Sequence, residues 1–171
     1  MLFTGLTRIN HNLIGFFTFK KGIEMKTIRQ ILKQKGRQIW STSPDTHVFD
    51  ALKLMAEKDV GALLVMDGEK VVGVFSERDY SRKIILKGKT SQTTLVHEIM
   101  SSPVVFIPAD QTCEEGLALM TARHIRHLPV FDGRKLIGVV SIGDLVKAVM
   151  QTQKQVIDKL EKYILDNMSL T

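Results

Sequence analysis

The chain has 171 residues, 44% of them hydrophobic and 25% charged, a composition that excludes a collagen, a coiled-coil rod and a wholly disordered protein. Its length suits one domain or two small ones, and no run reaches the ~18 consecutive apolar residues that a membrane-spanning helix needs. The formal net charge is +6. A single cysteine, Cys113, cannot form an internal disulfide. Because this suits a reducing compartment, we expect a cytoplasmic protein.

The positive charge is concentrated in two segments. Residues 26–38 carry five basic residues and no acid, and residues 82–97 carry four basic residues and no acid. Such segments are either solvated faces or patches that bind a polyanion such as nucleic acid. The sequence has no zinc-finger spacing and no aromatic-glycine strand motif of RNA-binding domains, and only 6% of its residues are aromatic. Nucleic acid is therefore disfavoured as the partner.

The first 24 residues differ from the rest of the chain. They contain four phenylalanines and three basic residues, with Glu24 as the one acid. We expect either a disordered extension or the product of an upstream start codon, with the working start at Met25. A weak organelle transit peptide is the alternative, because the segment is poor in acids. Downstream, a terminal helix is predicted over residues 29–35.

The rest of the chain is an internal repeat with a period of 65 residues. Residues 45–79 align without a gap on residues 110–144, and 13 of the 35 aligned pairs are identical. Most other aligned pairs are apolar in both copies, which is what a shared core pattern produces. The chain therefore contains two copies of one structural unit.

Each copy is predicted to form a helix, two strands and a second helix. Ser43-Pro44-Asp45 is expected to open the first helix, because it combines a capping hydroxyl with a proline in the first turn. Apolar residues follow at helical spacing in both copies, at Val48, Leu52 and Met55 and again at Cys113, Leu117 and Met120. Cys113 is thus predicted to be a small core residue rather than a nucleophile.

Two hairpins follow the first helices. Apolar runs over residues 61–66 and 70–75 flank Asp67-Gly68, and residues 126–131 and 135–140 flank the Asp-Gly pair at 132–133. This pattern predicts two-stranded hairpins whose strands are buried on both faces. A second helix is expected after each hairpin, residues 84–98 are expected to link the copies, and a terminal helix is predicted over residues 147–163.

The repeat resembles tandem cystathionine-beta-synthase (CBS) domains, the pair known as a Bateman module. The resemblance rests on residues 73–79 (GVFSERD) and 138–144 (GVVSIGD), which share the pattern G-x-x-S-x-x-D, and on residues 96–104 (VHEIMSSPV) and 125–130 (IRHLPV). It implies an α/β (α+β) fold in which two helix-strand-strand-helix repeats are related by a pseudo-twofold axis. The divisions expected are an extension at 1–24, a helix at 25–37, repeats at 38–94 and 95–150, and a helix or tail at 151–171.

The resemblance also implies ligands and a site. CBS pairs bind adenosine compounds, namely AMP, ADP, ATP, NAD(H) or S-adenosylmethionine. By resemblance, the contacts fall on Thr42, Ser76, Arg78, Asp79, Pro103, Val104, Arg126, His127, Ser141 and Asp144. A carboxylate at Asp79 or Asp144 can accept hydrogen bonds from a ribose diol, and free N–H groups at a helix start favour phosphate. The competing reading of Ser-x-x-Asp is a plain helix cap.

The two clefts are expected to differ. By resemblance, Asp79 and Ser76 face Arg126 and His127, with Arg78 nearby, so this cleft has cations for phosphate. The cleft of Asp144 meets residues 61 and 62, a glycine and an alanine, which supply room and little charge. We therefore expect a phosphate-rich ligand to prefer the cleft of Asp79, although Arg126 can equally be a solvated cation at a strand end.

No residues carry a catalytic reaction in this sequence. Paired carboxylates, a nucleophile elbow, a phosphate-binding loop and a dinucleotide glycine motif are all missing, and His124 and His127 have no metal-ligand partners beside them. We expect a non-enzymatic, homodimeric regulator that senses energy or redox state and passes nucleotide occupancy to a protein partner, away from membranes. The alternative is an interaction module with vestigial sites, whose basic segments bind an acidic partner or nucleic acid.

Overall fold

Two copies of one small α/β unit make up the fold, which confirms the predicted fold class. The computed structural model describes residues 25–36 and 38–168, so the expectation for residues 1–24 lies outside the described part. In chain order the elements are α2 (Ile28–Lys35), β1 (Ser41–Thr42), α3 (Val48–Lys58), β2 (Ala62–Asp67), β3 (Lys70–Ser76), α4 (Glu77–Lys83), β4 (Ile107–Pro108), α5 (Cys113–Arg123), β5 (His127–Asp132), β6 (Lys135–Ser141) and α6 (Ile142–Met168). Short 3-10 turns at Ile85–Lys87 and Val96–Glu98 lie between α4 and β4.

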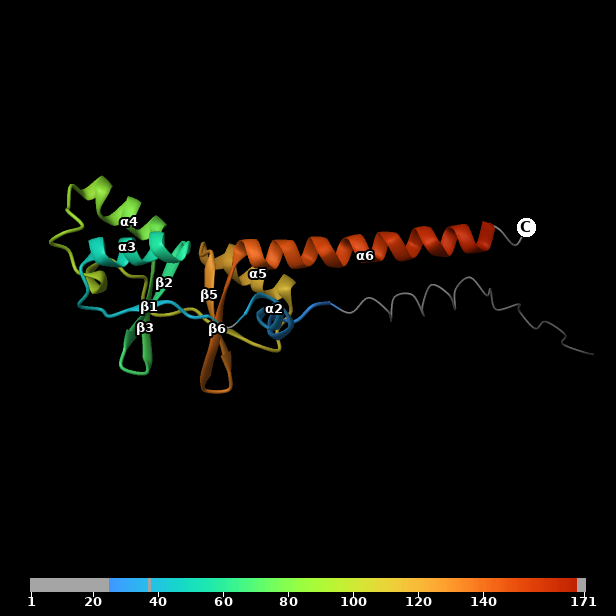
Figure 1. Ribbon diagram of the computed structural model, residues 1–171, viewed down its shortest axis with the longest axis horizontal. Coiled ribbons are helices and arrows are strands. Elements are labelled where there is room, and N and C mark those ends of the chain that lie inside the picture. The colour runs from blue at the N-terminus through green and yellow to red at the C-terminus, as the bar shows by residue number, and fades with distance from the viewer. Residues whose placement is uncertain (1–24, 37, 169–171) are drawn as a thin grey trace, which may run out of the picture.

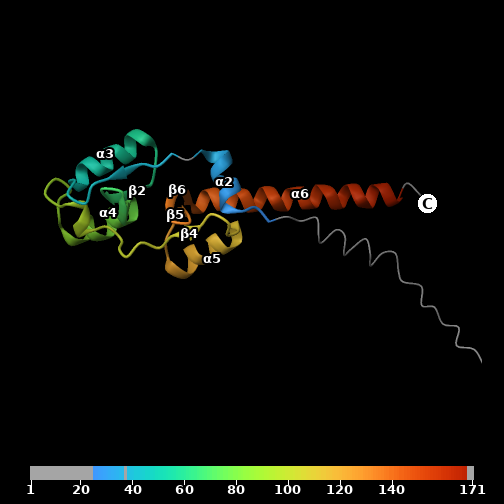
Figure 2. The same ribbon diagram turned by 90° about the horizontal axis from the view of Figure 1, so that it is seen from below.

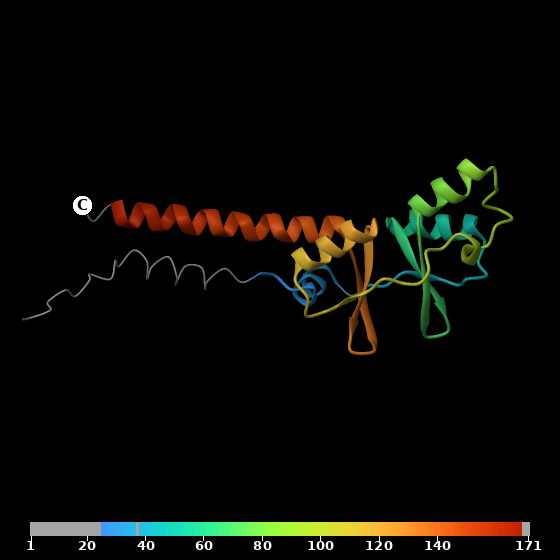
Figure 3. The ribbon, with the colours of Figure 1, turned by 180° about the vertical axis from the view of Figure 1, so that it is seen from behind.

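Each unit contains a three-stranded sheet, in the orders β1-β2-β3 and β4-β5-β6. The central strand pairs in parallel with a two-residue edge strand and antiparallel with its hairpin partner. Both hairpins turn at the predicted Asp-Gly pairs, where Gly68 and Gly133 have φ of 57° and 60°. Figures 1 and 3 show the units side by side, with the hairpin tips on one side and helices α3, α4, α5 and α6 on the other.

A chain segment from outside each repeat closes its core. Helix α2 packs on the second unit, where the N–H groups of Ile28 and Cys113 donate to the carbonyls of Gln111 and Lys26 at 2.9 and 3.0 Å. The linker makes the equivalent bonds on the first unit. There the N–H groups of Val96 and Val48 donate to the carbonyls of Thr46 and Thr94, both at 2.9 Å. We call each of these closing segments a strap. The strap of the second unit is α2, which comes before that unit in the sequence, and the strap of the first unit is the linker around residues 94–100, which comes after it.

The glycine that opens each G-x-x-S-x-x-D motif makes room for this strap. A Cβ built on Gly138 would lie 2.8 Å from Cδ2 of Leu32 in α2, and one built on Gly73 would contact the sulfur of Met100 and lie 2.9 Å from its Cγ. Leu32 and Ile28 are fully buried in the core of the second unit. The motif glycines thus serve packing, because a side chain at either position would displace the strap.

Two details differ from the sequence prediction. The first helix begins at Val48 rather than at Ser43, and no side chain caps it. The reason is that the carbonyls of Thr94 and Ser91 in the linker accept the N–H groups of Val48 and Phe49, which replaces a local cap. The second helix of the second unit and the predicted terminal helix are one continuous helix, α6, which projects beyond the sheets (Figure 2).

We predict that Gly138→Ala destabilises the protein by about 1–3 kcal/mol, because the added methyl group overpacks the contact with Leu32. Urea unfolding followed by circular dichroism measures this loss. In the double variant Gly138→Ala/Leu32→Ala the loss should be smaller than the sum of the two single losses. Gly143→Ala is the control, since a Cβ there meets its nearest atom, Oγ of Ser141, at 3.7 Å. Additive losses would contradict the packing role.

Candidate nucleotide-binding clefts

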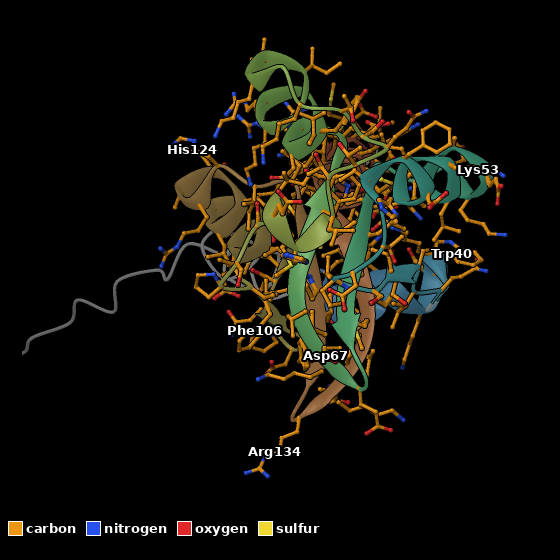
Figure 4. The ribbon with its side chains drawn as sticks, turned by 90° about the vertical axis from the view of Figure 1, so that its left-hand side faces the viewer. Trp40, Lys53, Asp67, Phe106, His124 and Arg134 are labelled. Atoms are coloured by element: carbon orange, nitrogen blue, oxygen red, sulfur yellow. The ribbon has the colours of Figure 1, made fainter. Side chains whose placement is uncertain are left out.

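Two cavities lie between the units, and each contains one of the motif aspartates. The first cleft, about 180 Å³ in volume, is lined by residues that include Ser76, Asp79, Pro103, Val104 and Arg126. The second cleft, about 440 Å³, is lined by residues that include Lys35, Trp40, Lys58, Ser141 and Asp144. Figure 4 shows Trp40 of the second cleft and His124 of the first on opposite sides of the molecule. Gly61 and His127 line both clefts and so form a wall between them.

In the first cleft, both carboxylate oxygens of Asp79 are occupied by hydrogen bonds within the protein. Oδ2 accepts the N–H and hydroxyl of Ser76 at 3.0 and 2.6 Å, while Oδ1 accepts Lys83 Nζ at 2.7 Å and the hydroxyl of Ser101 at 3.0 Å. Asp79 is also 8% exposed. A ribose diol that binds here has to displace one of these partners.

The cationic groups of the first cleft come from both units. Arg78 follows Ser76 on α4, and its guanidinium donates to the carbonyl of His124 at 2.8 Å, which fixes it across the cleft. Arg126 is exposed and lies immediately before β5. Burial lowers the pKa of His127, and the nearby charge of Lys35 lowers it further, so this ring is mostly neutral at pH 7. The arginines, rather than His127, therefore supply positive charge for a phosphate.

In the second cleft, Asp144 is partly free. Its Oδ2 accepts the N–H and hydroxyl of Ser141 at 2.7 and 2.8 Å and Lys35 Nζ at 2.5 Å. Among the described residues, each hydrogen bond to this carboxylate is accepted by Oδ2 and none by Oδ1, so Oδ1 can accept a hydrogen bond from another molecule. Burial raises the pKa of Asp144, but the hydrogen bonds from Lys35 and Ser141 outweigh burial and hold it below the ordinary value. Asp144 is therefore ionised at pH 7.

The expectation of little charge in the second cleft is wrong. Lys35 reaches it from the end of α2 and Lys58 from the end of α3, and the ammonium of Lys58 lies 4.7 Å from the ring centre of Trp40. The expected Gly61 and Ala62 do line this cleft. Their small side chains leave space, and lysines from two elements outside the hairpin of Asp144 supply the charge.

Most of the sequence-predicted residues gather in these clefts, and Thr42 does not. The first cleft brings together Ser76, Arg78, Asp79, Pro103, Val104, Arg126 and His127, and the second brings together Ser141 and Asp144 with His127. Thr42 is in β1 and lines neither cavity. The predicted capping bonds are present as well, between Ser76 and Asp79 and between Ser141 and Asp144. A cap and a ligand contact can coexist, because a carboxylate has several acceptor sites.

Sequence reasoning missed Lys35, Lys58, Lys83 and Ser101. The repeat holds a signal for Lys58, because the shift of 65 residues aligns it with Arg123, another cation at the end of a helix. Lys83 also had a signal, since it follows Asp79 at the i,i+4 spacing that favours ion pairs on a helix. Lys35 and Ser101 lie 109 and 22 residues from the aspartates that they contact, so no local sequence pattern predicts either contact.

The described residues offer few other chemical groups. Burial raises the pKa of the Cys113 thiol to about 11, so this residue is a protonated part of the core. Within residues 25–36 and 38–168 there is no group of three or more His, Cys, Asp or Glu side chains that could hold a metal ion. No helix in the same residues is long and apolar enough to cross a membrane.

Comparison with known proteins identifies the family. The family model of the CBS domain matches residues 28–86 and 96–151, so the chain belongs to the CBS-domain family. The mitochondrial CBS domain-containing protein CBSX3 of Arabidopsis thaliana is 37% identical over 155 residues, covering 85% of this chain and 75% of that protein. A solved CBS-domain protein from Burkholderia ambifaria MC40-6 has 50% identity and a TM-score of 0.71, covering 74% of this chain and 95% of that one.

A more distant structure shares the fold alone. The CBS domain pair of protein MJ0100 is 20% identical, with a TM-score of 0.66, and covers 75% of this chain and 98% of that one. It was solved in complex with 5′-methylthioadenosine and S-adenosyl-L-methionine. The matches to the first and second units confirm the recognition of a tandem CBS pair.

The ion pair between Lys35 and Asp144 leads to a pH prediction. A carboxylate with a lowered folded-state pKa stabilises the fold fully above its unfolded pKa of about 3.9, and this contribution is lost as pH falls through the lower folded value. In Lys35→Met the burial cost remains without the hydrogen bond, so the pKa of Asp144 should rise. NMR titration of the carboxyl carbon measures it. Lys33→Met, on an exposed position of the same helix, should leave it unchanged. An unchanged pKa in Lys35→Met would contradict this ion pair.

Proposed function

We propose that this protein is a non-catalytic regulator that binds an adenosine nucleotide between its two CBS units and passes the occupancy to a protein partner. The observation that carries the proposal is the content of the clefts. Each pairs a Ser-x-x-Asp helix start, which can hold a ribose diol, with cations from another element, which can hold phosphate. The adenosine compounds bound by the MJ0100 pair support the ligand class, because that protein has the same fold.

The second cleft is the better candidate for the nucleotide. Its volume of about 440 Å³ falls in the ~300–1,000 Å³ range of small-molecule sites, whereas the first, at about 180 Å³, is below it. One oxygen of Asp144 is available, while both oxygens of Asp79 accept bonds from the protein. Trp40 lines one side of the cleft, and adenine can stack on its ring by displacing the ammonium of Lys58, which lies 4.7 Å from the ring centre. This proposal reverses the preference for the Asp79 cleft that sequence reasoning favoured.

Binding between the units gives a route to regulation. Lys35 and Trp40 precede the first repeat's hairpin, whereas Asp144 follows the second, so one ligand contacts segments far apart in sequence. A ligand that binds one relative arrangement of these segments better shifts the population towards it, by as much as its affinities differ. The partner that reads this shift is a protein of this chain's own compartment, for which the cytoplasm stays our prediction.

A homodimer formed through the module also stays a proposal. Apolar side chains are exposed on the helical side, with Phe49 of α3 50% exposed and Ile142 at the start of α6 38% exposed. Burying such a face against a second copy removes apolar surface from water. A homodimeric regulator of this kind has two copies of each nucleotide cleft.

We predict that Asp144→Asn weakens AMP binding by about 1.5–3 kcal/mol, because it removes the charge from the carboxylate that accepts the ribose hydroxyls. Asparagine keeps one oxygen for the cap at Ser141, so the helix start should survive. Isothermal titration calorimetry measures the affinity. Asp79→Asn is the matched control in the first cleft and should have the smaller effect. A larger loss in Asp79→Asn would transfer the proposal to the first cleft, and no loss in either would refute nucleotide binding at these aspartates.

A basic surface for polyanions is the competing function, and the ion pairs argue against it. Arg29 pairs with Asp132 at 2.6 Å, Lys35 with Asp144, Lys83 with Asp79 at 2.7 Å and Lys89 with Glu98 at 3.1 Å. These four cations belong to the two basic segments, so much of that charge is neutralised within the fold. Charge already paired releases little free energy on binding a polyanion.

Lys58→Met separates the two functions. If Lys58 contacts a phosphate, the variant should lose affinity for AMP by about tenfold or more and keep its affinity for adenosine, which has no phosphate. Lys33→Met, which removes a cation from a basic segment outside the clefts, should bind both ligands like the wild type. Fluorescence titration with both ligands at two salt concentrations measures this. Equal losses for AMP and adenosine, or a salt-dependent loss in Lys33→Met, would favour the basic surface.

A further inference from the structure

Helix α6 extends well beyond the CBS pair that it begins in. Leu145 and Ala148 are buried against the second unit, and Val149 packs against the same core. From residue 157 to residue 168 every residue is exposed, and Figures 1, 2 and 3 all show this part of α6 projecting away from both sheets. The family match ends at residue 151, so the projection lies outside the shared module.

The projecting helix carries an apolar stripe with a spacing of seven residues. Met150, Ile157 and Ile164 occupy one position of the heptad and are 63%, 54% and 54% exposed. Val146 and Leu160, which are 41% and 38% exposed, occupy a second heptad position, three residues after the first. Isoleucine at the first position and leucine at the second are the residues that parallel two-stranded coiled coils prefer.

The apolar stripe has to pack against another surface for the projecting part of α6 to be stable. Segments of fewer than about 12–15 residues are marginal as isolated helices in water, and most helices in proteins are stabilised by packing of their apolar face. Within the part of the chain that the structure describes, the stripe residues Ile157, Leu160 and Ile164 have no such packing, since they are 54%, 38% and 54% exposed. The length of the helix therefore points to a partner along the stripe.

The charges identify the kind of partner. Residues 153–168 contain three lysines (154, 159, 162) and three acids (158, 161, 166), so their net charge is zero. A helix that binds an anionic membrane or a nucleic acid carries an excess of basic residues on its polar face. Here the lysines and acids alternate, as at Lys154 and Asp158, which makes the helix compatible with a second copy of itself.

We propose that the projecting part of α6 forms a parallel, two-stranded coiled coil with α6 of a second copy. The direction follows from two polar residues in the stripe, Gln153 and Asn167, at the position that Leu160 also occupies. In a parallel pair each amide faces its own counterpart and can hydrogen-bond to it. In an antiparallel pair centred between Ile157 and Leu160, Gln153 faces Ile164 and Asn167 faces Met150, which leaves both amides against apolar groups.

This coiled coil is a contact in addition to any that the CBS units of the two copies form with each other. It does not rest on nucleotide binding, since none of its residues lines either cleft. It places the two second units of a dimer at the same end of the assembly, because both α6 helices start at the end of β6.

Disulfide trapping in the full chain tests the pairing and its direction. Gln153→Cys and Gln155→Cys are matched variants two residues apart, on the stripe and on the opposite, polar face. With oxidised glutathione, Gln153→Cys should form a covalent dimer at least tenfold faster than Gln155→Cys at equal concentration. The wild type is the blank, because its Cys113 is buried. An antiparallel pair would hold the two copies of residue 153 about 16 Å apart, at the ~1.5 Å rise per residue of a helix, and give no such dimer.

Leu160→Glu provides the second measurement. The charge in the stripe should raise the dimer dissociation constant in analytical ultracentrifugation by at least tenfold and lower the helix signal in circular dichroism. Gln155→Glu adds the same charge on the polar face and should change neither. Equal trapping rates at residues 153 and 155, with no effect of Leu160→Glu on dissociation, would overturn the proposal, whether another protein or residues 1–24 covered the stripe instead.

Discussion

The fold depends on the contact between each hairpin and a strap from outside its repeat. Leu32 of helix α2 packs against Gly138, and Met100 of the linker packs against Gly73. Neither hairpin could bury its apolar face alone, because a two-stranded ribbon is at best marginally stable in water. The straps complete both cores, and α2 also ties the units together, since the chain has to cross from the second unit to the first after this helix.

The same crossing builds the clefts. Because α2 packs on the second unit before the chain enters the first, its last residue, Lys35, reaches Asp144. On the first unit the linker takes the corresponding place, and Ser101 reaches Asp79. The two clefts thus share a plan and differ in content, since the helix α2 forms the strap on one unit and the linker, with its 3-10 turn at Val96–Glu98, forms it on the other. The ammonium of Lys35 in α2 bonds to Asp144, and the hydroxyl of Ser101 in the linker bonds to Asp79.

The sequence was most informative where the determining interactions are local or repeated. The Asp-Gly turns at residues 67 and 132 predicted both hairpins, because the turn geometry needs only neighbouring residues. The gapless repeat predicted that the two units have the same core pattern, and each unit has its own core of that kind. The resemblance predicted that Asp79 lies near Arg126 and that Asp144 lies near Gly61, and the structure groups these residues in the same two cavities. The motif that carries each aspartate also starts the helix that positions it.

Long-range contacts set what the sequence could not predict. Strands β1 and β4 are two residues long and exist only because they pair in parallel with a strand far along the chain. The start of α3 was misplaced because the linker caps it through backbone carbonyls, which leave no trace in side-chain patterns. Part of the charge of the second cleft was missed for the same reason, as Lys35 comes from an element with no fixed spacing to Asp144.

Lys35 connects the strap to the second cleft, and under the proposed function this contact gives the cleft a means of signalling. It is bonded to Asp144 through its ammonium and belongs to the helix that closes the core of the second unit through Leu32. A ligand that takes over Asp144 or offers a phosphate to Lys35 changes the contacts at the end of α2. Gly36 follows at once with φ of 95°, a conformation suited to glycine, so the chain turns there towards the first unit. Under the proposed function, a ligand in the cleft therefore acts on the segment that joins the two units, which is the element that a change in their relative arrangement has to move.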